Sequence, residues 1–192
     1  MPAKRSKPST AVSSRTSTAV RGAPSTAVAV RSKTPFPTRV DLPADTRVAL
    51  GMILNERLAD FLDLERQAKQ AHWNVKGPRF FALHELFDTV AGLAVTWADD
   101  LAERAVQLGC VAEGTSQVVA SRSKLPQAPL MAADDDAWVH VVAEALAFCT
   151  NATRADIADA EAADDAVTTD LLTRITSEVD KQLWFVESHL IS

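Results

Sequence analysis

The chain of 192 residues contains no tyrosine, only two cysteines and no long uninterrupted hydrophobic segment. Cys110 and Cys149 are far apart in the sequence, so they match neither a paired-cysteine metal motif nor a disulfide framework. We expect both to be buried thiols of a protein in a reducing compartment. No apolar run approaches the ~18 residues that a membrane span requires, and the N-terminus lacks the apolar core of a secretory signal. These absences argue against membrane proteins and disulfide-rich secreted proteins.

Acidic residues are absent from residues 1–40, which carry eight basic ones and repeat Ser-Thr-Ala-Val three times. The remaining residues hold 12 basic and 25 acidic side chains, a charge of −13 that together with the +8 of this segment gives the overall −5. The segment has too little apolar surface to offset the entropy of ordering, which predicts a disordered tail over 1–40. A basic tail on an acidic body indicates different partners for the two parts. The basic residues are Lys4, Arg5, Lys7, Arg15, Arg21, Arg31, Lys33 and Arg39.

Two other interpretations of the tail stay open. An inert linker would explain its low complexity, although eight cations without one anion weigh against that interpretation. An organellar transit peptide would explain its composition, since such peptides are rich in Ser and Arg and poor in acidic residues.

Apolar residues beyond position 45 recur at helical spacing, which predicts an all-α fold. The pattern indicates four long helices, over about 44–76, 80–108, 135–162 and from about 166 onward, with breaks at Gly77-Pro78, Gly109 and 163–165. A long connection at 110–133 separates the second and third helices and has room for a short helix near 116–120. We expect a ferritin-like four-helix bundle over 41–192, in which this connection crosses over because helices two and three run parallel. Other four-helix bundles fit the helix lengths nearly as well.

Two pairs of candidate metal ligands lie on the second helix. His84 and Asp88 are one turn apart, as are Asp99 and Glu103. The nearest members of the two pairs are separated by about 16 Å along the axis, at about 1.5 Å per residue. The two pairs of one chain therefore cannot share a metal ion.

A second copy of the helix, laid antiparallel, brings the pairs together. With a two-fold axis between Leu93 and Ala94, His84 falls opposite Glu103 of the second copy, and Asp88 falls opposite Asp99. One imidazole and three carboxylates then converge at each of two equivalent sites, as an isologous interface requires. The spacing predicts a metal site made between subunits.

His72 near the end of the first helix is a fifth candidate, because a short turn folds it back toward His84. Imidazole and carboxylate ligands without a thiolate suit iron, zinc or manganese, and hard oxygen ligands favour iron that cycles between +2 and +3. The competing interpretation is a set of solvated acidic residues and structural histidines on a metal-free four-helix adaptor. The predicted ligand set is His72, His84, Asp88, Asp99 and Glu103.

Three segments resemble one protein family. KQAHWNVKGPRFFALHELFD at 69–88, DDLAERAVQLG at 99–109 and DKQLWFVES at 180–188 are similar to the signature of Dps, the DNA-binding protein from starved cells. The resemblance spans about 38–190 and leaves out the tail. The family pattern of two histidines and an aspartate, then an aspartate and a glutamate, falls on the five residues named above without a substitution.

The resemblance implies a mini-ferritin of twelve subunits with ferroxidase centres at two-fold dimer interfaces. Each centre would bind two iron ions without an organic cofactor, oxidise Fe(II) with hydrogen peroxide and pass Fe(III) to a mineral in the hollow shell. Trp73 matches a family tryptophan that could intercept oxidising equivalents, although a packing role at the end of the helix explains it equally well. Acidic pores for iron entry would lie near the start of the last helix, where the sequence has Glu161, Asp164, Asp165 and Asp170.

DNA binding is expected from the tail, because a body of charge −13 would repel phosphate. No base-reading motif is present, so binding would be independent of sequence. A cytoplasmic, nucleoid-associated protein without a membrane partner is expected. The alternative function is a mainly structural protein that condenses the nucleoid and has little ferroxidase activity.

Overall fold

The computed structural model of the chain describes Met1 and residues 36–191. This part contains five helices and no strand, which confirms the all-α prediction. None of its helices includes a stretch long and apolar enough to cross a membrane. The helices are α1 (Ala44–Asn74), α2 (Phe80–Gln107), α3 (Ser116–Arg122), α4 (Asp135–Ala162) and α5 (Ala166–Glu187).

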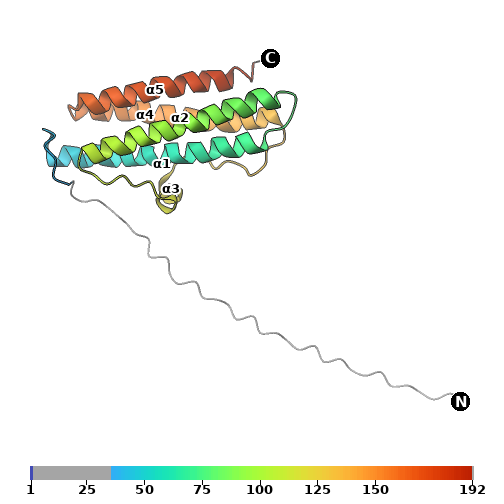
Figure 1. Ribbon diagram of the computed structural model, residues 1–192, viewed down its shortest axis with the longest axis horizontal. Coiled ribbons are helices and arrows are strands. Elements are labelled where there is room, and N and C mark those ends of the chain that lie inside the picture. The colour runs from blue at the N-terminus through green and yellow to red at the C-terminus, as the bar shows by residue number, and fades with distance from the viewer. Residues whose placement is uncertain (2–35, 192) are drawn as a thin grey trace. The chain divides into compact units, whose positions relative to one another are not determined.

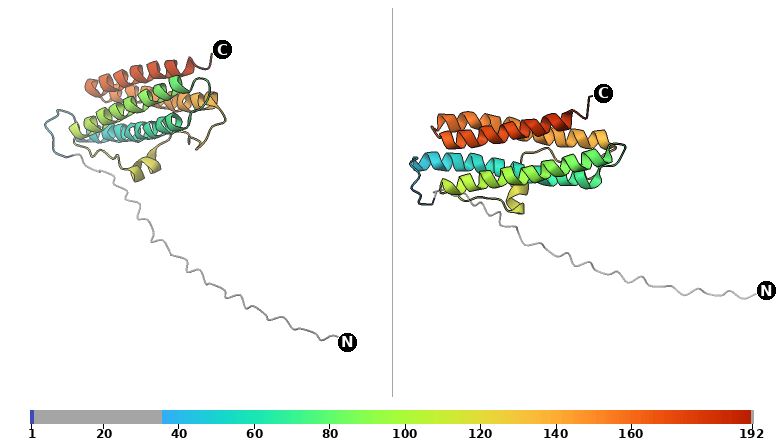
Figure 2. Two further views of the ribbon diagram at one scale, coloured as in Figure 1. Left: turned by 45° about the vertical axis from the view of Figure 1, so that its right-hand side comes forward. Right: turned by 45° about the horizontal axis from the view of Figure 1, so that its top comes forward.

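The four long helices form two antiparallel hairpins that pack on each other (Figure 1). One hairpin is α1 with α2, and the other is α4 with α5. The connection from α2 to α4 returns along the length of the bundle and carries α3, so that α2 and α4 run in the same direction (Figure 2). The predicted four-helix bundle with a crossover and a short helix in it is therefore confirmed.

Local chemistry explains where the helices begin and end. The Asp134 carboxylate accepts a hydrogen bond of 2.8 Å from the Ala137 amide and caps α4, and Asp165 accepts from two amides at the start of α5. Such caps satisfy amides that have no partner within the helix. The breaks after α1 and α2 use Gly77 and Gly109, whose φ angles of 128° and 82° favour glycine.

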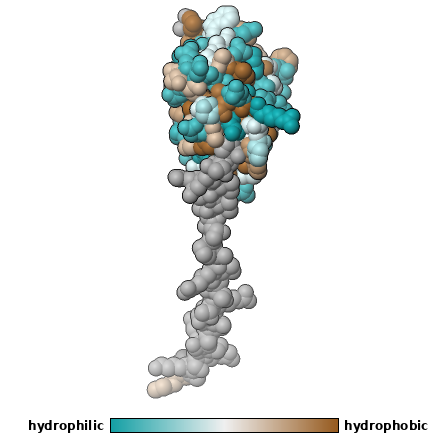
Figure 3. Space-filling model, turned by 90° about the vertical axis from the view of Figure 1, so that its left-hand side faces the viewer, coloured by the Kyte–Doolittle hydropathy of each residue, from teal (hydrophilic) through white to brown (hydrophobic). Residues whose placement is uncertain are grey.

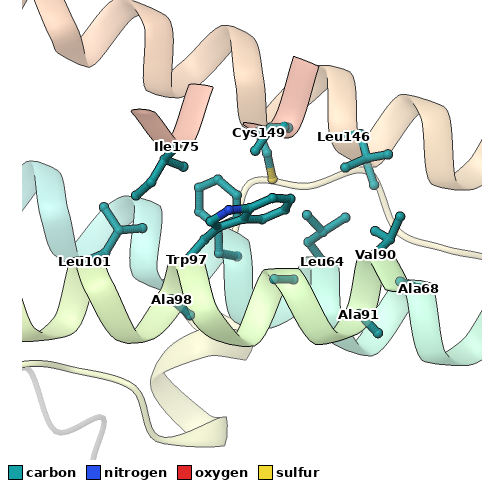
Figure 4. Close-up of a cluster of buried hydrophobic side chains, with 14 of the residues drawn as sticks. Leu64, Ala68, Val90, Ala91, Trp97, Ala98, Leu101, Leu146, Cys149 and Ile175 are labelled. Carbon is teal, nitrogen blue, oxygen red and sulfur yellow. The ribbon is translucent and has the colours of Figure 1, made fainter. Parts of the chain in front are cut away.

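The core lies where the two hairpins meet (Figure 4). Trp97 on α2 is fully buried, and its ring contacts Phe61 on α1 edge to face with 5.7 Å between ring centroids. The Trp97 indole N–H donates to Glu178 on α5 at 2.6 Å, so the one polar atom of the ring is satisfied. Both cysteines are buried, as predicted, and burial raises the pKa of the Cys149 thiol well above its usual value.

Polar side chains on one face of α1 hold the long connection against the bundle. The connection has little regular structure, so its backbone groups need partners outside it. They find them on residues spaced three to five apart along α1, which is one face of the helix. The bonds to backbone groups are Asn55 to Val111 and Glu113, Asp60 to Lys124, Gln67 to Pro126 and Gln70 to Leu130, and the Ser123 hydroxyl in addition donates to the Asp63 carboxylate, all at 2.6–3.0 Å.

Candidate metal centre

The turn between α1 and α2 brings His72 and His84 face to face. Their rings are stacked with 3.7 Å between centroids. Nδ1 of His72 lies 2.8 Å from the carbonyl oxygen of His84, and Nδ1 of His84 lies 2.9 Å from the carbonyl oxygen of His72. Because a carbonyl oxygen can only accept, each Nδ1 must donate its proton. In the neutral imidazoles the lone pair then lies on Nε2, which is the state that a metal requires.

Asp88 is the third predicted ligand at this end of α2. Its carboxylate forms an ion pair with Lys69 on α1 and lies 3.9 Å from Nδ1 of His72. The hydrogen bond from Lys69 is the main cause that lowers the pKa of Asp88. The carboxylate is half exposed, so it remains accessible to a metal. Sequence reasoning missed Lys69, although its position three residues before His72 on the same face of α1 could have revealed it.

Asp99 and Glu103 lie on the same helix but at a distance from this cluster. Both are exposed on the surface of the single chain. In the part of the chain that the structure describes, no group of three or more His, Cys, Asp or Glu side chains is arranged to hold a metal ion. The single chain thus holds two separate groups of candidate ligands. One comprises His72 on α1 with His84 and Asp88 on α2, and the other comprises Asp99 and Glu103 on α2.

The turn between α1 and α2, which brings the two histidines together, is fixed by contacts to other parts of the chain. Arg79 donates to Asp135 at 3.1 Å, to Asp136 at 2.6 Å and to the carbonyl of His189 at 2.7 Å. A Cβ on Gly77 would lie 3.1 Å from Asp135, so this residue packs tightly on the start of α4. Through these contacts, α4 and the C-terminal segment both hold the turn in place. Their partners lie far away in the sequence, so the sequence alone did not reveal them.

The aromatic residues at this end of the bundle are mostly exposed. Trp73 is next to His72 in the sequence, but its side chain points toward solvent with 59% of its surface exposed. Phe80 tilts against His84 with 5.1 Å between ring centroids. Packing within one chain therefore does not account for Trp73.

The four acidic residues predicted near an entry pore have different surroundings. Asp165 is buried, bonds Arg104 through both carboxylate oxygens at 2.8–2.9 Å and caps α5. Burial alone would raise the pKa of Asp165, but hydrogen bonds from Thr168 and Arg104 outweigh burial and lower it. Asp165 is thus occupied by contacts within the chain. The other three, Glu161, Asp164 and Asp170, are exposed.

Most of the predicted DNA-binding tail lies outside the described residues. Of its eight basic residues only Arg39 is described, and it is exposed. The segment just before α1 contacts the end of α2: the Phe36 amide donates to the Gly109 carbonyl, and the Thr38 hydroxyl donates to the Gln107 carbonyl at 3.4 Å. The predicted domain boundary at residue 40 stays a prediction.

Comparisons with known proteins identify the family. The model of the ferritin-like domain family matches residues 52–191. A relative named DNA protection during starvation protein, from Agrobacterium fabrum, is 41% identical over 138 residues, which cover 72% of this chain and 85% of the relative. This chain belongs to the Dps family.

Solved structures agree with that assignment to Dps. DpsC from Streptomyces coelicolor is 31% identical and superposes with a TM-score of 0.79, covering 83% of this chain and 93% of that one. DpsA14 from the same organism is 33% identical with a TM-score of 0.78, covering 83% and 94%. The resemblance to Dps and the ferritin-like fold predicted from the sequence are therefore both confirmed.

Proposed function

We propose that this Dps chain is a mini-ferritin that oxidises Fe(II) with hydrogen peroxide at sites shared between two subunits and stores Fe(III) in a hollow dodecamer. The observation that carries the proposal is the stacked pair His72 and His84, whose reciprocal bonds to backbone carbonyls leave both Nε2 atoms available to a metal. The half-exposed Asp88 beside them supplies an oxygen ligand.

The remaining ligands come from a second subunit in this proposal. In the antiparallel arrangement, Glu103 of the partner subunit lies opposite His84, and Asp99 of the partner subunit lies opposite Asp88. Carboxylate oxygens with imidazole nitrogens suit Fe(II) and stabilise Fe(III) further, because hard oxygen ligands favour the higher charge. Two Fe(II) ions bind at each site as substrates, with Glu103 in position to bridge them.

The reaction balances with two iron ions for each peroxide. One H₂O₂ takes one electron from each of two Fe(II) ions and takes up two protons, which yields two Fe(III) ions and two water molecules. Simultaneous supply of both electrons avoids the hydroxyl radical that a one-electron step would release. The contribution of the protein is to hold the two ions together and to leave positions open for peroxide.

The first test replaces the carboxylates that the second subunit contributes. The double variant Asp99→Asn with Glu103→Gln should lose fast peroxide-driven Fe(II) oxidation, recorded as iron absorbance after anaerobic loading. Glu144→Gln with Asp159→Asn is the matched control, because it removes two charges from exposed positions on α4. Unchanged kinetics in the first variant would refute the ligand assignment.

A mixing experiment tests whether two subunits share each site. One variant carries His72→Ala and His84→Ala, and the other carries Asp99→Asn and Glu103→Gln. In a dimer made of one chain of each, one of the two sites is intact, so random reassembly of equal amounts should restore about a quarter of the sites. A site built within one chain would show no recovery.

We further propose that the basic tail binds DNA without reading its sequence and brings the protein to the nucleoid. The support is the charge distribution, since eight cations precede a body of charge −13. Twelve tails on one shell would bind with avidity and could bridge duplexes. This feature also supports the second candidate function, a structural protein that condenses DNA, which differs from the first by inactive iron sites.

Deletion of residues 1–40 tests the tail in a gel-shift assay. The full-length protein should retard duplex DNA, with a slope of log affinity against log salt concentration near −7 if all eight cations contact phosphates. The deletion should abolish retardation. A variant with the eight basic residues replaced by Gln keeps the length of the tail and should behave as the deletion does. Equal retardation by all three proteins would rule out a DNA-binding tail.

Iron entry is proposed to use the exposed acidic residues around the turn between α4 and α5. Glu161, Asp164 and Asp170 have exposed side chains there. Asp165 from the same predicted set is held by Arg104, so we assign it a positioning role at the end of this turn.

A further inference from the structure

Glu103, which is proposed to bridge the two iron ions, is followed in the sequence by a buried arginine. The Glu103 side chain is exposed, whereas Arg104 is buried. Successive side chains of an α-helix point roughly 100° apart, because one turn has about 3.6 residues, so the two residues face different sides of α2. The side of Arg104 faces the start of α5, and contacts made there can determine where Glu103 lies.

The guanidinium group of Arg104 has a bonded partner on each of its three nitrogen atoms. Nη2 donates to both carboxylate oxygens of Asp165, at 2.8 and 2.9 Å, and Nε donates to the Thr168 hydroxyl at 2.9 Å. Nη1 donates to Gln107 in the last turn of α2 at 3.3 Å. The Thr168 hydroxyl in turn donates to Asp165. A network in which every member is bonded holds one arrangement of its side chains, so α2 and α5 meet here in a fixed register.

The network lies inside the protein rather than on its surface. Figure 3 views the molecule from the end where α2 finishes and α5 begins and shows a surface of mixed hydrophilic and apolar side chains. The Arg104 and Asp165 side chains are only 8% and 4% exposed, so water screens their attraction little. Replacing a buried ion pair by apolar side chains often leaves stability unchanged or raises it. Stability alone therefore does not account for this pair, and the register that it sets between the two helices distinguishes it from an apolar contact.

The end of α2 is where such a register matters for the iron site. Glu103 lies four residues before Gln107, the last residue of the helix. The final carbonyl groups of a helix have no partner within it, so the last turn is the part of α2 that moves most easily. A misplacement of about 1 Å at a reacting centre can cost about a hundredfold in rate. The position of the Glu103 carboxylate therefore depends on what holds the last turn of α2.

We propose that Arg104 is a positioning residue for Glu103. Through its bonds to Asp165 and Thr168, it fixes the last turn of α2 against α5 and thereby fixes where the bridging carboxylate lies in the shared site. Arg104 does not contact iron and acts only through the helix. The inference rests on the proposed function, since it takes Glu103 as a ligand of iron. It gives the buried ion pair a role in the reaction, although neither partner is an iron ligand.

A second ion pair between α2 and α5 serves as an internal comparison. Asp100, which follows the candidate ligand Asp99, accepts a hydrogen bond of 2.8 Å from Arg174. The side chains of Arg174 and Asp100 are 44% and 33% exposed, so water and salt weaken the attraction and the pair holds its helices less firmly. Arg174 is a matched control for Arg104, because it is the same type of residue and joins the same two helices beside a candidate ligand.

Arg104→Lys tests the role in the full-length protein. Lysine keeps the positive charge but lacks the planar group that bonds Asp165 and Thr168 at the same time. The rate constant for peroxide-driven Fe(II) oxidation at saturating iron should fall roughly tenfold or more. The Fe(II) concentration for half-saturation should change less, because the histidines and Asp88 still bind iron. Arg174→Lys should stay within about twofold of the wild type in both quantities.

Binding of Co(II) alone, followed by its visible absorption, gives a readout that a merely structural role would not move. The bands of Co(II) depend on the number and the geometry of its ligands. Arg104→Lys should bind Co(II) with altered bands, whereas Arg174→Lys should reproduce the wild-type spectrum. A loss of global stability without displacement of Glu103 would leave the spectrum of the folded protein unchanged.

Asp165→Asn repeats the test from the other partner of the ion pair. Asparagine is also a good residue for capping α5, so this variant removes the ion pair and keeps the start of the helix. It should show the same fall in rate and the same change in the Co(II) spectrum as Arg104→Lys. It carries the test if Arg104→Lys does not fold, which circular dichroism establishes.

The outcomes distinguish this inference from the proposed function. Wild-type rates and Co(II) spectra in Arg104→Lys and Asp165→Asn, or equal changes in Arg174→Lys, would overturn the positioning inference and leave the ferroxidase proposal in place. Unchanged iron oxidation in the double variant Asp99→Asn with Glu103→Gln would refute the ferroxidase proposal, and with it the inference that rests on it. Lost oxidation in that double variant, with slower oxidation and altered bands in the two network variants alone, would support both.

Discussion

Two groups of charged residues in this molecule have similar chemistry and opposite surroundings. One is an interior cluster between α1 and α4, made of Arg57, Asp60 and Asp156. The other is the face of α2 that carries the candidate ligands His84, Asp88, Asp99 and Glu103, which we call the α2 stripe. The interior cluster is enclosed by a single chain, whereas the stripe is exposed, and within residues 36–191 its acidic and histidine side chains form no group arranged to hold a metal ion.

The charged groups of the interior cluster lie close together, but several of their atoms lack a hydrogen bond. Arg57 lies 3.1 Å from Asp60 and 3.4 Å from Asp156. Within residues 36–191, Nε of Arg57 and one carboxylate oxygen of each aspartate are buried without a hydrogen-bond partner. Burial raises the pKa of Asp156 to about 6 and also raises that of Asp60. These charges therefore strain the folded state and neutralise one another only in part.

The difference shows what decides the role of a charged residue in this fold. Buried charges must be compensated within the chain, so their replacement affects folding. Exposed carboxylates on the stripe cost little in the single chain, and in the proposed dimer a second chain brings its ligands toward them. We expect mutations in the two groups to separate stability from activity.

The largest expected effect comes from Arg57→Met in the interior cluster. The substitution leaves two buried carboxylates without their cation, which should lower the free energy of unfolding by about 3–5 kcal/mol. Urea unfolding followed by circular dichroism measures it. Arg154→Met is the matched control, because Arg154 pairs with Asp180 at the exposed surface and its loss should cost less than about 1 kcal/mol. Equal losses would contradict the contrast between the two regions.

A smaller and pH-dependent effect is expected for Asp156→Asn. The pKa of Asp156 is about 6 in the folded chain, above the ordinary value of 3.8, so the folded state holds the extra proton between these two pH values. Its contribution to stability is present below pH 4 and is lost as the pH rises through 6. The variant lacks this loss and should gain about 1–2 kcal/mol relative to the wild type between pH 4 and pH 7.

Thermal unfolding of Asp156→Asn across this pH range provides the measurement. Glu144→Gln, at an exposed position on the same helix, should show no such trend. A stability difference that stays constant with pH would contradict a pKa of about 6 for Asp156.

The smallest stability effects are expected on the α2 stripe, where substitutions of His84 and Asp99 should differ in their cost to stability. His84→Ala removes a bond to the carbonyl of His72 and should cost about 1 kcal/mol, or about 2–4 °C in Tm. Asp99→Asn should stay within about 0.5 kcal/mol of the wild type because its side chain is exposed. Both should lose ferroxidase activity. A large loss of stability in Asp99→Asn would indicate a structural role for that carboxylate.

Much of the fold followed from local signals. The breaks at Gly77 and Gly109 could be predicted because each glycine acts within a few residues of the chain. The crossover connection was predicted from its length, but the bonds that attach it to α1 were not. Asn55, Gln67 and Gln70 hold backbone groups more than fifty residues away, and no spacing along α1 reveals those partners.

The candidate site was predicted only in part, again because local spacing is visible in the sequence and contacts between distant segments are not. The pairs on α2 follow from helical spacing, and His72 followed from the short turn. Lys69 beside Asp88 was missed although its helical spacing from His72 pointed to it, whereas the contacts of Arg79 with Asp135 and His189 appeared only in the folded chain. The buried state of Asp165 was equally hidden, since its partner Arg104 lies 61 residues away in the sequence.

The sequence by itself determined the helices, the family and the symmetric spacing of the stripe, because all of these depend on residues close together in the chain or on short motifs. The tertiary structure decided which charges are buried and which ring nitrogen of each histidine keeps its lone pair. These depend on the approach of segments distant in sequence, which is governed by packing and by the need to satisfy buried polar groups.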